Sequence, residues 1–372
     1  MAHVIFRLDV GGLENGLVNL INQTPPGIFR HAIICVTHAT DFRRRIEADD
    51  VAIIELNKKP GTDLAVYWRF WRAVRRLKPD VIHTRNLNTI EFQPFAFLAG
   101  VRARIHGEHG WDVHDIDGTS RKYRVLRKML RPFVDRFIAV SQGLHDYLTA
   151  AVRVSPDRIS LIYNGVDLTK FSPRETSDGK GGQTCAATVR PIVIGTIGRM
   201  KEVKNQRLLV QAFVGLIRSH PDQRSRIRLL MAGDGPLRDE LMNDLSNAGL
   251  VEFCSFPGAC DNVAELLRDI DIFVLPSRNE GISNTILEAM GTALPVVATR
   301  VGGTPEIVSD SVTGVLVDDG DVSALVSALL RYIENPELRR RHGTAGRARA
   351  QAKFSLGAMV ARYLDVYRQC LN

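Results

Sequence analysis

Two glutamates, Glu280 and Glu288, are separated by seven residues that include a glycine. An apolar run precedes them and an apolar-periodic helix starts near Asn284, so we expect Glu280 in a loop and Glu288 about one turn into the helix. Backbone amides near residues 283–285 would then be free at a helix N-terminus, where they favour a phosphate. Carboxylates accept hydrogen bonds from sugar hydroxyls. The pair therefore indicates a site with a nucleotide ribose on one side of a phosphate and a hexose on the other. Ordinary roles, a helix-dipole partner for Glu280 and a solvated position for Glu288, do not explain the two together.

Two cations, Arg199 and Lys204, follow the apolar run 192–197. An arginine can bridge two phosphate oxygens and a lysine adds a point charge, so this pair at the end of a strand suits a diphosphate. A pair of ordinary surface cations is equally compatible with the local sequence.

Glycines accompany two other strand ends. Gly11, Gly12 and Gly16 lie between an apolar run and a helical pattern, where a ligand could approach the backbone closely. They do not form the GxGxxG dinucleotide fingerprint, and a plain tight turn explains them as well. Gly233 and Gly235 occupy a similar place in the segment 233–236.

The elements that must position these residues alternate between strands and helices. This pattern predicts parallel sheets with both faces covered by helices. Ligands of such sheets bind beyond the carboxyl ends of the strands, where the residues above lie. The expected strands are residues 4–8, 32–36, 51–55, 81–84, 104–107, 136–140, 159–162, 192–197, 228–232, 251–256, 270–275, 295–298 and 314–317.

A chain of 372 residues is long enough for two domains. The segment 173–189 has few apolar residues and a Gly/Ser/Thr-rich centre, which predicts a linker. We therefore expect an N-terminal Rossmann-like domain over 1–172, a linker over 173–190 and a second domain over 191–355. The last helix, about 356–372, could pack back on the first domain. Five widely spaced cysteines favour reduced thiols, and no secretory signal or 18-residue apolar run is evident, so we expect a cytoplasmic protein.

The net charge of +8 comes from one stretch of the chain. Residues 66–136 contain 15 Lys/Arg and 7 Asp/Glu, whereas the remaining residues balance. Within it, residues 121–131 combine a stripe of Tyr123, Leu126 and Leu130 with many cations, which is typical of a helix on an anionic membrane. A solvated basic surface is the alternative, and nucleic acid is not expected because no recognition motif accompanies the charge. The candidate membrane or acceptor contacts are Arg121, Lys122, Arg124, Arg127 and Lys128.

The glutamate block resembles the donor site of the retaining family 4 glycosyltransferases. Its continuation through residues 289–298 and 302–308 matches, as do 163–167, 198–205 and 233–236 in the expected order. The resemblance covers essentially the whole chain. Residues 3–19 and 107–112 are similar to the exopolysaccharide sugar-transferase branch of that family.

This resemblance implies an α/β GT-B fold, with two Rossmann-like domains facing across a cleft. It also implies a nucleotide-diphosphate sugar donor, transfer with retention, and no metal or other cofactor. By position, Glu288 would bind the ribose and Glu280 the donor sugar. His109 falls where the family has a histidine near the reacting centre. The diphosphate would meet Arg199, Lys204 and the backbone at Gly12 and at Ser283, Asn284 and Thr285.

The resemblance further implies a glycan acceptor, often lipid-linked, on the N-terminal domain, and therefore a peripheral location on the inner face of the membrane. One departure is that Ile282-Ser283 replaces the Phe-Gly of many members, so the sugar is not inferred. Asp115 and Asp117 match the letters of a DxD metal motif but lie in a polar loop. Two other functions remain open: a nucleotide-sugar epimerase of GT-B-like fold, and a non-catalytic protein that binds nucleotide sugars or membrane lipids.

Overall fold

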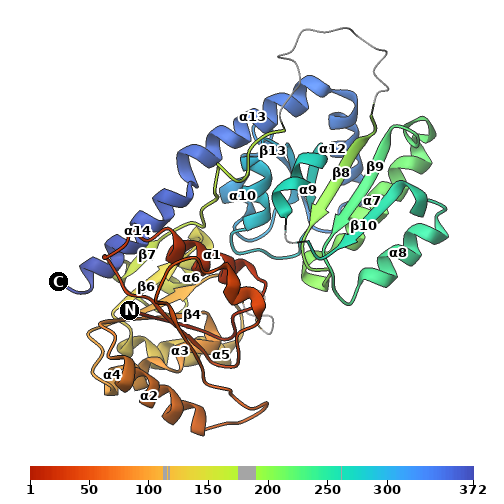
Figure 1. Ribbon diagram of the computed structural model, residues 1–372. Helices are drawn as coiled ribbons and strands as arrows, with labels where there is room; N and C mark the ends of the chain where they lie inside the picture. The colour runs from red at the N-terminus through yellow and green to blue at the C-terminus, as the bar shows by residue number, and fades with distance from the viewer. Residues whose placement is uncertain (112–114, 116–117, 175–189, 261) are drawn as a thin grey trace. The chain divides into compact units, whose positions relative to one another are not determined.

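The computed structural model describes residues 1–111, 115, 118–174, 190–260 and 262–372. These residues form two compact units, each described here by itself (Figure 1). The N-terminal unit comprises Met1–Gly165 together with Leu356–Asn372, and the C-terminal unit comprises Val166–Ser355. The division therefore falls seven residues before the predicted boundary at 172, and most of the predicted linker lies outside the described residues.

A parallel seven-stranded sheet forms the centre of the N-terminal unit, with strand order β3-β2-β1-β4-β5-β6-β7. The order reverses between β1 and β4, so the loops after these two strands diverge there. Alternate residues of each strand point to opposite faces of the sheet. The strands are β1 (Ala2–Ile5), β2 (Ala32–Cys35), β3 (Ala52–Glu55), β4 (Val81–Arg85), β5 (Ala103–Glu108), β6 (Arg136–Ala139) and β7 (Ile159–Leu161).

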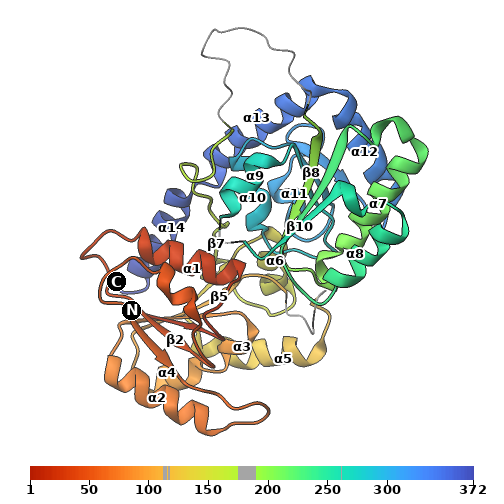
Figure 2. The ribbon, with the colours of Figure 1, turned by 45° about the vertical axis from the view of Figure 1, so that its right-hand side comes forward.

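Helices cover both faces of this sheet. One face holds α1 (Gly12–Asn22) and α14 (Leu356–Gln369), whose apolar side chains pack on Val81, Ala103 and Ile105. The final helix of the chain thus belongs to the N-terminal unit. The other face holds α2 (Ala65–Leu77) and α4 (Gln93–Leu98), with α3 (Leu87–Ile90) and α5 (Arg121–Leu130) beside them (Figure 2). Helix α6 (Gln142–Ala150) follows β6.

The C-terminal unit repeats this plan with a parallel six-stranded sheet in the order β10-β9-β8-β11-β12-β13. Here the order reverses between β8 and β11. The strands are β8 (Ile192–Ile197), β9 (Ile227–Ala232), β10 (Cys254–Gly258), β11 (Ile272–Leu275), β12 (Val296–Thr299) and β13 (Gly314–Val317).

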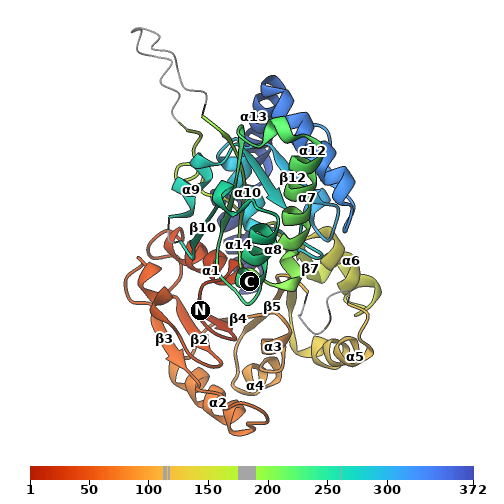
Figure 3. The same cartoon turned by 90° about the vertical axis from the view of Figure 1, so that its right-hand side faces the viewer.

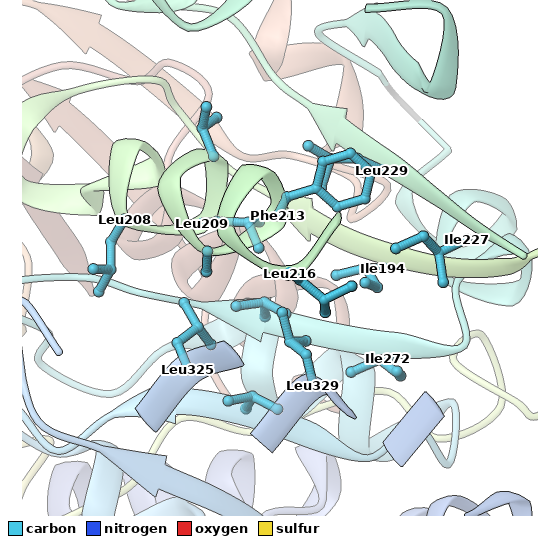
Figure 4. Close-up of a cluster of buried hydrophobic side chains, with 14 of the residues drawn as sticks. Ile194, Leu208, Leu209, Phe213, Leu216, Ile227, Leu229, Ile272, Leu325 and Leu329 are labelled. Atoms are coloured by element: carbon cyan, nitrogen blue, oxygen red, sulfur yellow. The ribbon is translucent and has the colours of Figure 1, made fainter. Parts of the chain in front are cut away.

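A large apolar core holds α7, α8 and α12 against this sheet (Figure 4). Phe213 and Leu216 of α7 are fully buried beside Leu229 of β9 and Leu329 of α12. Helix α10 packs on α13 and on the neighbouring α9. The helices are α7 (Gln206–Ser219), α8 (Arg238–Asn247), α9 (Val263–Asp269), α10 (Asn284–Gly291), α11 (Thr304–Ile307), α12 (Val322–Glu334) and α13 (Pro336–Lys353).

Two parallel sheets with helices on both faces confirm the predicted pair of Rossmann-like domains. Every expected strand is present, and the runs 192–197 and 314–317 keep both predicted ends. Most other ends shift by one or two residues, and the first strand and the strand expected at 251–256 shift most. The first strand is Ala2–Ile5 instead of 4–8, because the chain leaves the sheet at the exposed Phe6 and Leu8 makes only a single bridge to Ala39. The strand expected at 251–256 begins at Cys254, since Val251–Phe253 forms a 3₁₀ turn.

Across the described ranges, the helices are all too short or too polar to span a bilayer.

Candidate functional site

The reversal point of the C-terminal sheet brings Lys204 and Glu280 into direct contact. Lys204 Nζ donates to Glu280 Oε1 at 2.6 Å, and Ser277 Oγ donates to the same oxygen at 2.5 Å. Lys204 follows β8 and Glu280 follows β11, and the amide of Arg278 donates to the carbonyl of Val203, which ties the two loops together. The Glu280 side chain is only 9% exposed. Both residues were predicted at a donor site, but their pairing was not predicted.

Two glycines support the Glu280 loop from the next strand. A Cβ at Gly302 would lie 1.9 Å from the carbonyl oxygen of Glu280, and one at Gly303 would lie 2.0 Å from that of Gly281. Gly302 also has a φ of +50°, in the left-handed region that glycine tolerates best. These glycines let the loops after β11 and β12 pack backbone to backbone, which fixes the position of the Glu280 backbone.

Helix α10 begins at Asn284, so Glu288 lies in its second turn, as predicted. Ser283 is the N-cap: its Oγ accepts from the amide of Ile286 at 3.4 Å and lies 3.1 Å from Thr285 Oγ1. One of the amides at this helix N-terminus therefore already has a side-chain partner. Glu288 is half-buried on the same helix.

Arg199 and the glycines of residues 233–236 lie in the loops that follow β8 and β9, which contact each other through the amide of Met200 and the carbonyl of Asp234. The Arg199 side chain is exposed, and none of the described carboxylates forms an ion pair with it. A Cβ at Gly233 would lie 2.1 Å from the carbonyl oxygen of Gly198, and one at Gly235 would lie 2.3 Å from that of Met200. Close packing of the loops after β8 and β9 is thus sufficient reason for both glycines.

The reversal point of the N-terminal sheet contains a small pocket. Gly12 and Gly16 of α1 line it together with Arg85, His109 and Tyr363. Gly11 is the N-cap of α1 and gives it no side-chain hydrogen bond. Of the predicted residues, the structure thus brings Gly12, Gly16 and His109 together in this unit.

His109 is held with its ring against the sheet. Its amide donates to Asn86 Oδ1 at 2.7 Å, while its Nε2 is buried and has no hydrogen-bond partner. Burial, reinforced by the positive charge of Arg85, lowers the pKa of His109 to about 3. A Cβ at Gly107 would lie 2.7 Å from His109 Nε2 and 2.8 Å from His83 Nε2, so this glycine makes room for both imidazoles.

The prediction that Arg127 is a surface cation is wrong. Arg127 was expected to face a membrane, but it is 2% exposed and donates to both carboxylate oxygens of Glu108, at 2.6 and 3.2 Å. Although burial alone would raise it, the Arg127 charge and hydrogen bonds from His106 and Arg127 hold the pKa of Glu108 well below its usual range. Arg127 lies on the side of α5 that packs on the protein.

The other predicted cations of α5 remain outside. Arg121 and Lys122 are exposed, and Arg124 and Lys128 are half-buried. The expected apolar stripe of Tyr123, Leu126 and Leu130 is itself half-buried against the unit, so these residues are not the exposed anchors. Val125 and Met129, which are 44% and 68% exposed, occupy that position instead.

Arg85 is the main residue that the sequence analysis missed. It ends β4, and the residues of its strand that share its face are Val81 and His83. A positive charge and a histidine at alternate positions of an otherwise buried strand were the available signal.

The structure identifies no metal centre among the residues it describes: no three His, Cys, Asp or Glu side chains are grouped to hold an ion. Asp115 is buried and accepts from the amide of Ser120 at 2.8 Å, whereas Asp117 lies outside the described residues, as does Asp112.

Two family models match the chain, one in each unit. The model for Glycosyltransferase Family 4 matches residues 10–170, and that for Glycosyl transferases group 1 matches residues 191–335. Both predicted domains therefore have a counterpart in glycosyltransferases.

Curated relatives extend this similarity along the chain. The D-inositol 3-phosphate glycosyltransferase of Actinosynnema mirum is 31% identical over 345 residues, which cover 88% of this chain and 82% of that protein. The enzyme of the same name from Corynebacterium kroppenstedtii is 27% identical over 67% of this chain, but only 56% of its own length is matched. The UDP-Gal:alpha-D-GlcNAc-diphosphoundecaprenol alpha-1,3-galactosyltransferase of Escherichia coli is 28% identical, over 72% of this chain and 70% of that enzyme.

A solved structure has the same fold. The Anabaena protein HepE, in complex with UDP and glucose, superimposes with a TM-score of 0.81 at 19% identity, over 99% of both chains. This supports the GT-B assignment of the two Rossmann-like units. With models matched in both units and a relative aligned over most of its length, the chain belongs to the family 4 glycosyltransferases, and it is a glycosyltransferase of GT-B fold.

Proposed function

We propose that this enzyme transfers a sugar from a nucleotide-diphosphate sugar to a lipid-linked glycan, with retention of configuration and without a metal. The process would be exopolysaccharide or related cell-surface glycan synthesis. The name of the Escherichia coli relative describes a diphosphoundecaprenol-linked acceptor, which supports this class of acceptor. The complex of HepE with UDP and glucose supports a uridine nucleotide among the donors to test first.

The contact between Lys204 and Glu280 carries the proposal. A lysine ammonium has three donors, so Lys204 can hold the Glu280 carboxylate and still donate to a phosphate oxygen. Cleavage of the glycosyl–phosphate bond leaves negative charge on the diphosphate. Lys204, Arg199 and the N-terminal amides of α10 would stabilise that charge, which removes the need for a metal.

The same contact positions Glu280 for the donor sugar. Its Oε1 is occupied by Lys204 and Ser277, and the carboxylate as a whole retains acceptor capacity for a sugar hydroxyl. Glu288, in the second turn of α10, would bind the ribose. His109, with an unpartnered and neutral Nε2, would hydrogen-bond the donor sugar near the reacting centre.

The test is a donor screen followed by a transfer assay. UDP-, GDP- and ADP-sugars are ranked by the rise they cause in melting temperature. The best donor is then incubated with a polyprenyl-diphosphate-linked sugar, and NMR of the product reports whether the anomeric configuration is retained. EDTA should leave the rate unchanged. An epimerised donor in the absence of acceptor would instead identify an epimerase, and binding without any turnover would identify a non-catalytic protein.

A basic aromatic face would bring the enzyme to its lipid-linked acceptor. We define it as the outer side of α2, α4 and α5, which lie together in one helical layer of the N-terminal unit (Figure 3). Its large exposed side chains are Leu64, Trp68, Trp71, Phe97, Leu98, Val125 and Met129. The guanidinium groups of Arg72 and Arg75 lie 4.8 and 5.8 Å from the ring centres of Trp68 and Trp71.

Aromatic rings beside exposed cations suit the interface of an anionic membrane. Each cation near such a surface contributes about 1 kcal/mol. Replacing Arg72, Arg75 and Arg76 with Gln should therefore weaken co-sedimentation with phosphatidylglycerol vesicles by roughly 100-fold. The matched control changes the exposed Arg331, Arg340 and Arg341 to Gln, which removes the same charge from the C-terminal unit. Equal losses in both triple variants would contradict a membrane role for this face.

A further inference from the structure

Arg85 is a buried cation that lines the pocket of the N-terminal unit. It is the last residue of β4, and the residue as a whole is 3% exposed. No carboxylate in the described part of the chain forms an ion pair with it. Burying a charge without a partner costs several kcal/mol even after relaxation, so the absence of a counter-ion here requires an explanation.

The histidines next to Arg85 are neutral, and the hydrogen bonds between them show which ring nitrogen carries the proton. Arg85 Nη1 lies 3.1 Å from His3 Nδ1, and because a guanidinium can only donate, that nitrogen must accept. The proton of neutral His3 is therefore on Nε2, which donates to His31 Nδ1 at 3.0 Å. Burial and the charge of Arg85 lower the pKa of His3 well below its usual value, and burial with the N-terminal amine lowers that of His31 to about 4. Neither ring offers a negative charge.

The nearest carboxylate on the neighbouring strand is already engaged. Glu108 ends β5 on the opposite side of the sheet from Arg85, because Arg85 is in register with Gly107 and successive residues of a strand point to opposite faces. Its two oxygens accept from Arg127. The unit thus contains two buried arginines, one fully compensated by a carboxylate and one directed to a pocket.

A second group in the pocket has no partner among the described residues. The buried Nε2 of His109 lies in the same lining as Arg85 and makes no hydrogen bond there. Gly12 and Gly16 of α1 complete one side of the pocket without side chains. The N-terminus of α1 already has a carboxylate beside it, because Glu14 lies in its first turn with Oε2 2.1 Å from where a Cβ of Gly11 would stand. The positive charge of the pocket is therefore that of Arg85.

We propose that Arg85 binds an anionic oxygen of the acceptor, a carboxylate or a phosphate, at the reversal point of the N-terminal sheet. This rests on the proposed function, and it names the chemistry of the second substrate. The bound anion supplies the counter-charge that the described residues do not provide. Arg85 is then a residue that selects charged acceptors over neutral ones.

The first test uses inorganic phosphate as the probe on the wild-type protein saturated with UDP. Phosphate should raise the melting temperature above that in chloride at equal ionic strength, because it binds only the folded state. In Arg85→Gln the apparent Kd for phosphate should rise about 10- to 100-fold, whereas Arg85→Lys should keep part of the affinity. The control is Arg368→Gln, which removes an exposed arginine of α14 in the same unit and should bind phosphate as the wild type does.

The second test separates the acceptor from the donor as the source of the anion. If Arg85 binds the acceptor, UDP affinity is the same in Arg85→Gln and wild type, while phosphate and UDP bind together. Loss of UDP affinity in Arg85→Gln, or competition between phosphate and UDP, would overturn the acceptor assignment and give the site to the donor.

The two proposals fail in different ways. If the wild type turns over no nucleotide sugar, the proposed function is wrong. If it turns over a donor but phosphate stabilises wild type and Arg85→Gln equally, the donor chemistry stands and the Arg85 site is refuted. Since the wild-type comparison of phosphate with chloride needs no variant, a poorly folded Arg85→Gln still leaves the proposal open to refutation: no difference between the salts refutes it.

Discussion

The two sheets reverse their strand order in the same way, but the cations at the two reversal points have different partners. In the C-terminal unit, Lys204 and Glu280 meet at 2.6 Å, and Ser283 caps α10. In the N-terminal unit, Arg85 has no carboxylate partner among the described residues, and the first turn of α1 contains Glu14. The lysine at one reversal point is paired with a carboxylate before any ligand binds, whereas the arginine at the other is not.

This difference shows that one sheet plan can hold a cation in two ways. A compensated pair can exchange hydrogen bonds with a ligand, and it loses little stability when no ligand is bound. A buried cation without a carboxylate is stable only because the rest of the unit holds it in place, and a bound anion would stabilise it.

The largest effect should come from the compensated arginine of the N-terminal unit. Arg127→Met leaves the Glu108 carboxylate buried and unpaired, so it should lower the free energy of unfolding by about 3–5 kcal/mol in urea titrations. Arg85→Met is the matched variant, since it removes a buried arginine that leaves no carboxylate behind. It should cost much less. Equal losses would show that Arg85 also has a hidden counter-charge, and the contrast between the two arginines would be wrong.

A slightly smaller effect is expected on activity in the C-terminal unit. Lys204→Gln removes the charge that we propose stabilises the leaving diphosphate, and it leaves Glu280 without its cation. We expect kcat/KM to fall by about 10²–10³, or about 2.7–4 kcal/mol of transition-state stabilisation. Steady-state kinetics with the best donor measures this change. Arg340→Gln, an exposed arginine paired only with Glu337 on its own helix, is the control and should retain the wild-type rate.

The cap of α10 should contribute less still. Ser283→Ala removes the acceptor for the amide of Ile286 and should lower the free energy of unfolding by about 1 kcal/mol, whereas Ser283→Gly should cost only a few tenths. If α10 instead resembles the uncapped α1, the alanine variant will be as stable as the wild type. Urea titration distinguishes the two outcomes, and the same variants report whether UDP binding depends on this hydroxyl.

The sequence predicted most of the fold because the strands are short apolar runs between clear turn signals. The run 192–197 and the run 314–317 are strands with those same ends. Contacts between side chains distant in the sequence were harder to predict. The contact of Lys204 with Glu280, for example, depends on the strand order, which decides which loops are neighbours. The burial of Arg127 could have been predicted, because it lies four residues after Tyr123 and three before Leu130, on the stripe that packs inward. The burial of Arg85 was not predicted, because its charge was included in the basic stretch 66–136 that was assigned to the surface.

The last prediction is that the effect of replacing His109 does not change with pH. Burial and the charge of Arg85 lower the pKa of His109 to about 3. A group whose pKa lies there is more than about 99% neutral at pH 5.5 and above, so its protonation cannot change across the working range. His109→Gln should therefore reduce the transfer rate by the same factor at every pH between 5.5 and 8.5. A ratio of wild-type to variant rates that changes between pH 6 and 8 would mean that His109 titrates normally. In that case the imidazole is less buried in the working enzyme or an anion neutralises Arg85, because burial and the Arg85 charge are the two main causes that lower this pKa.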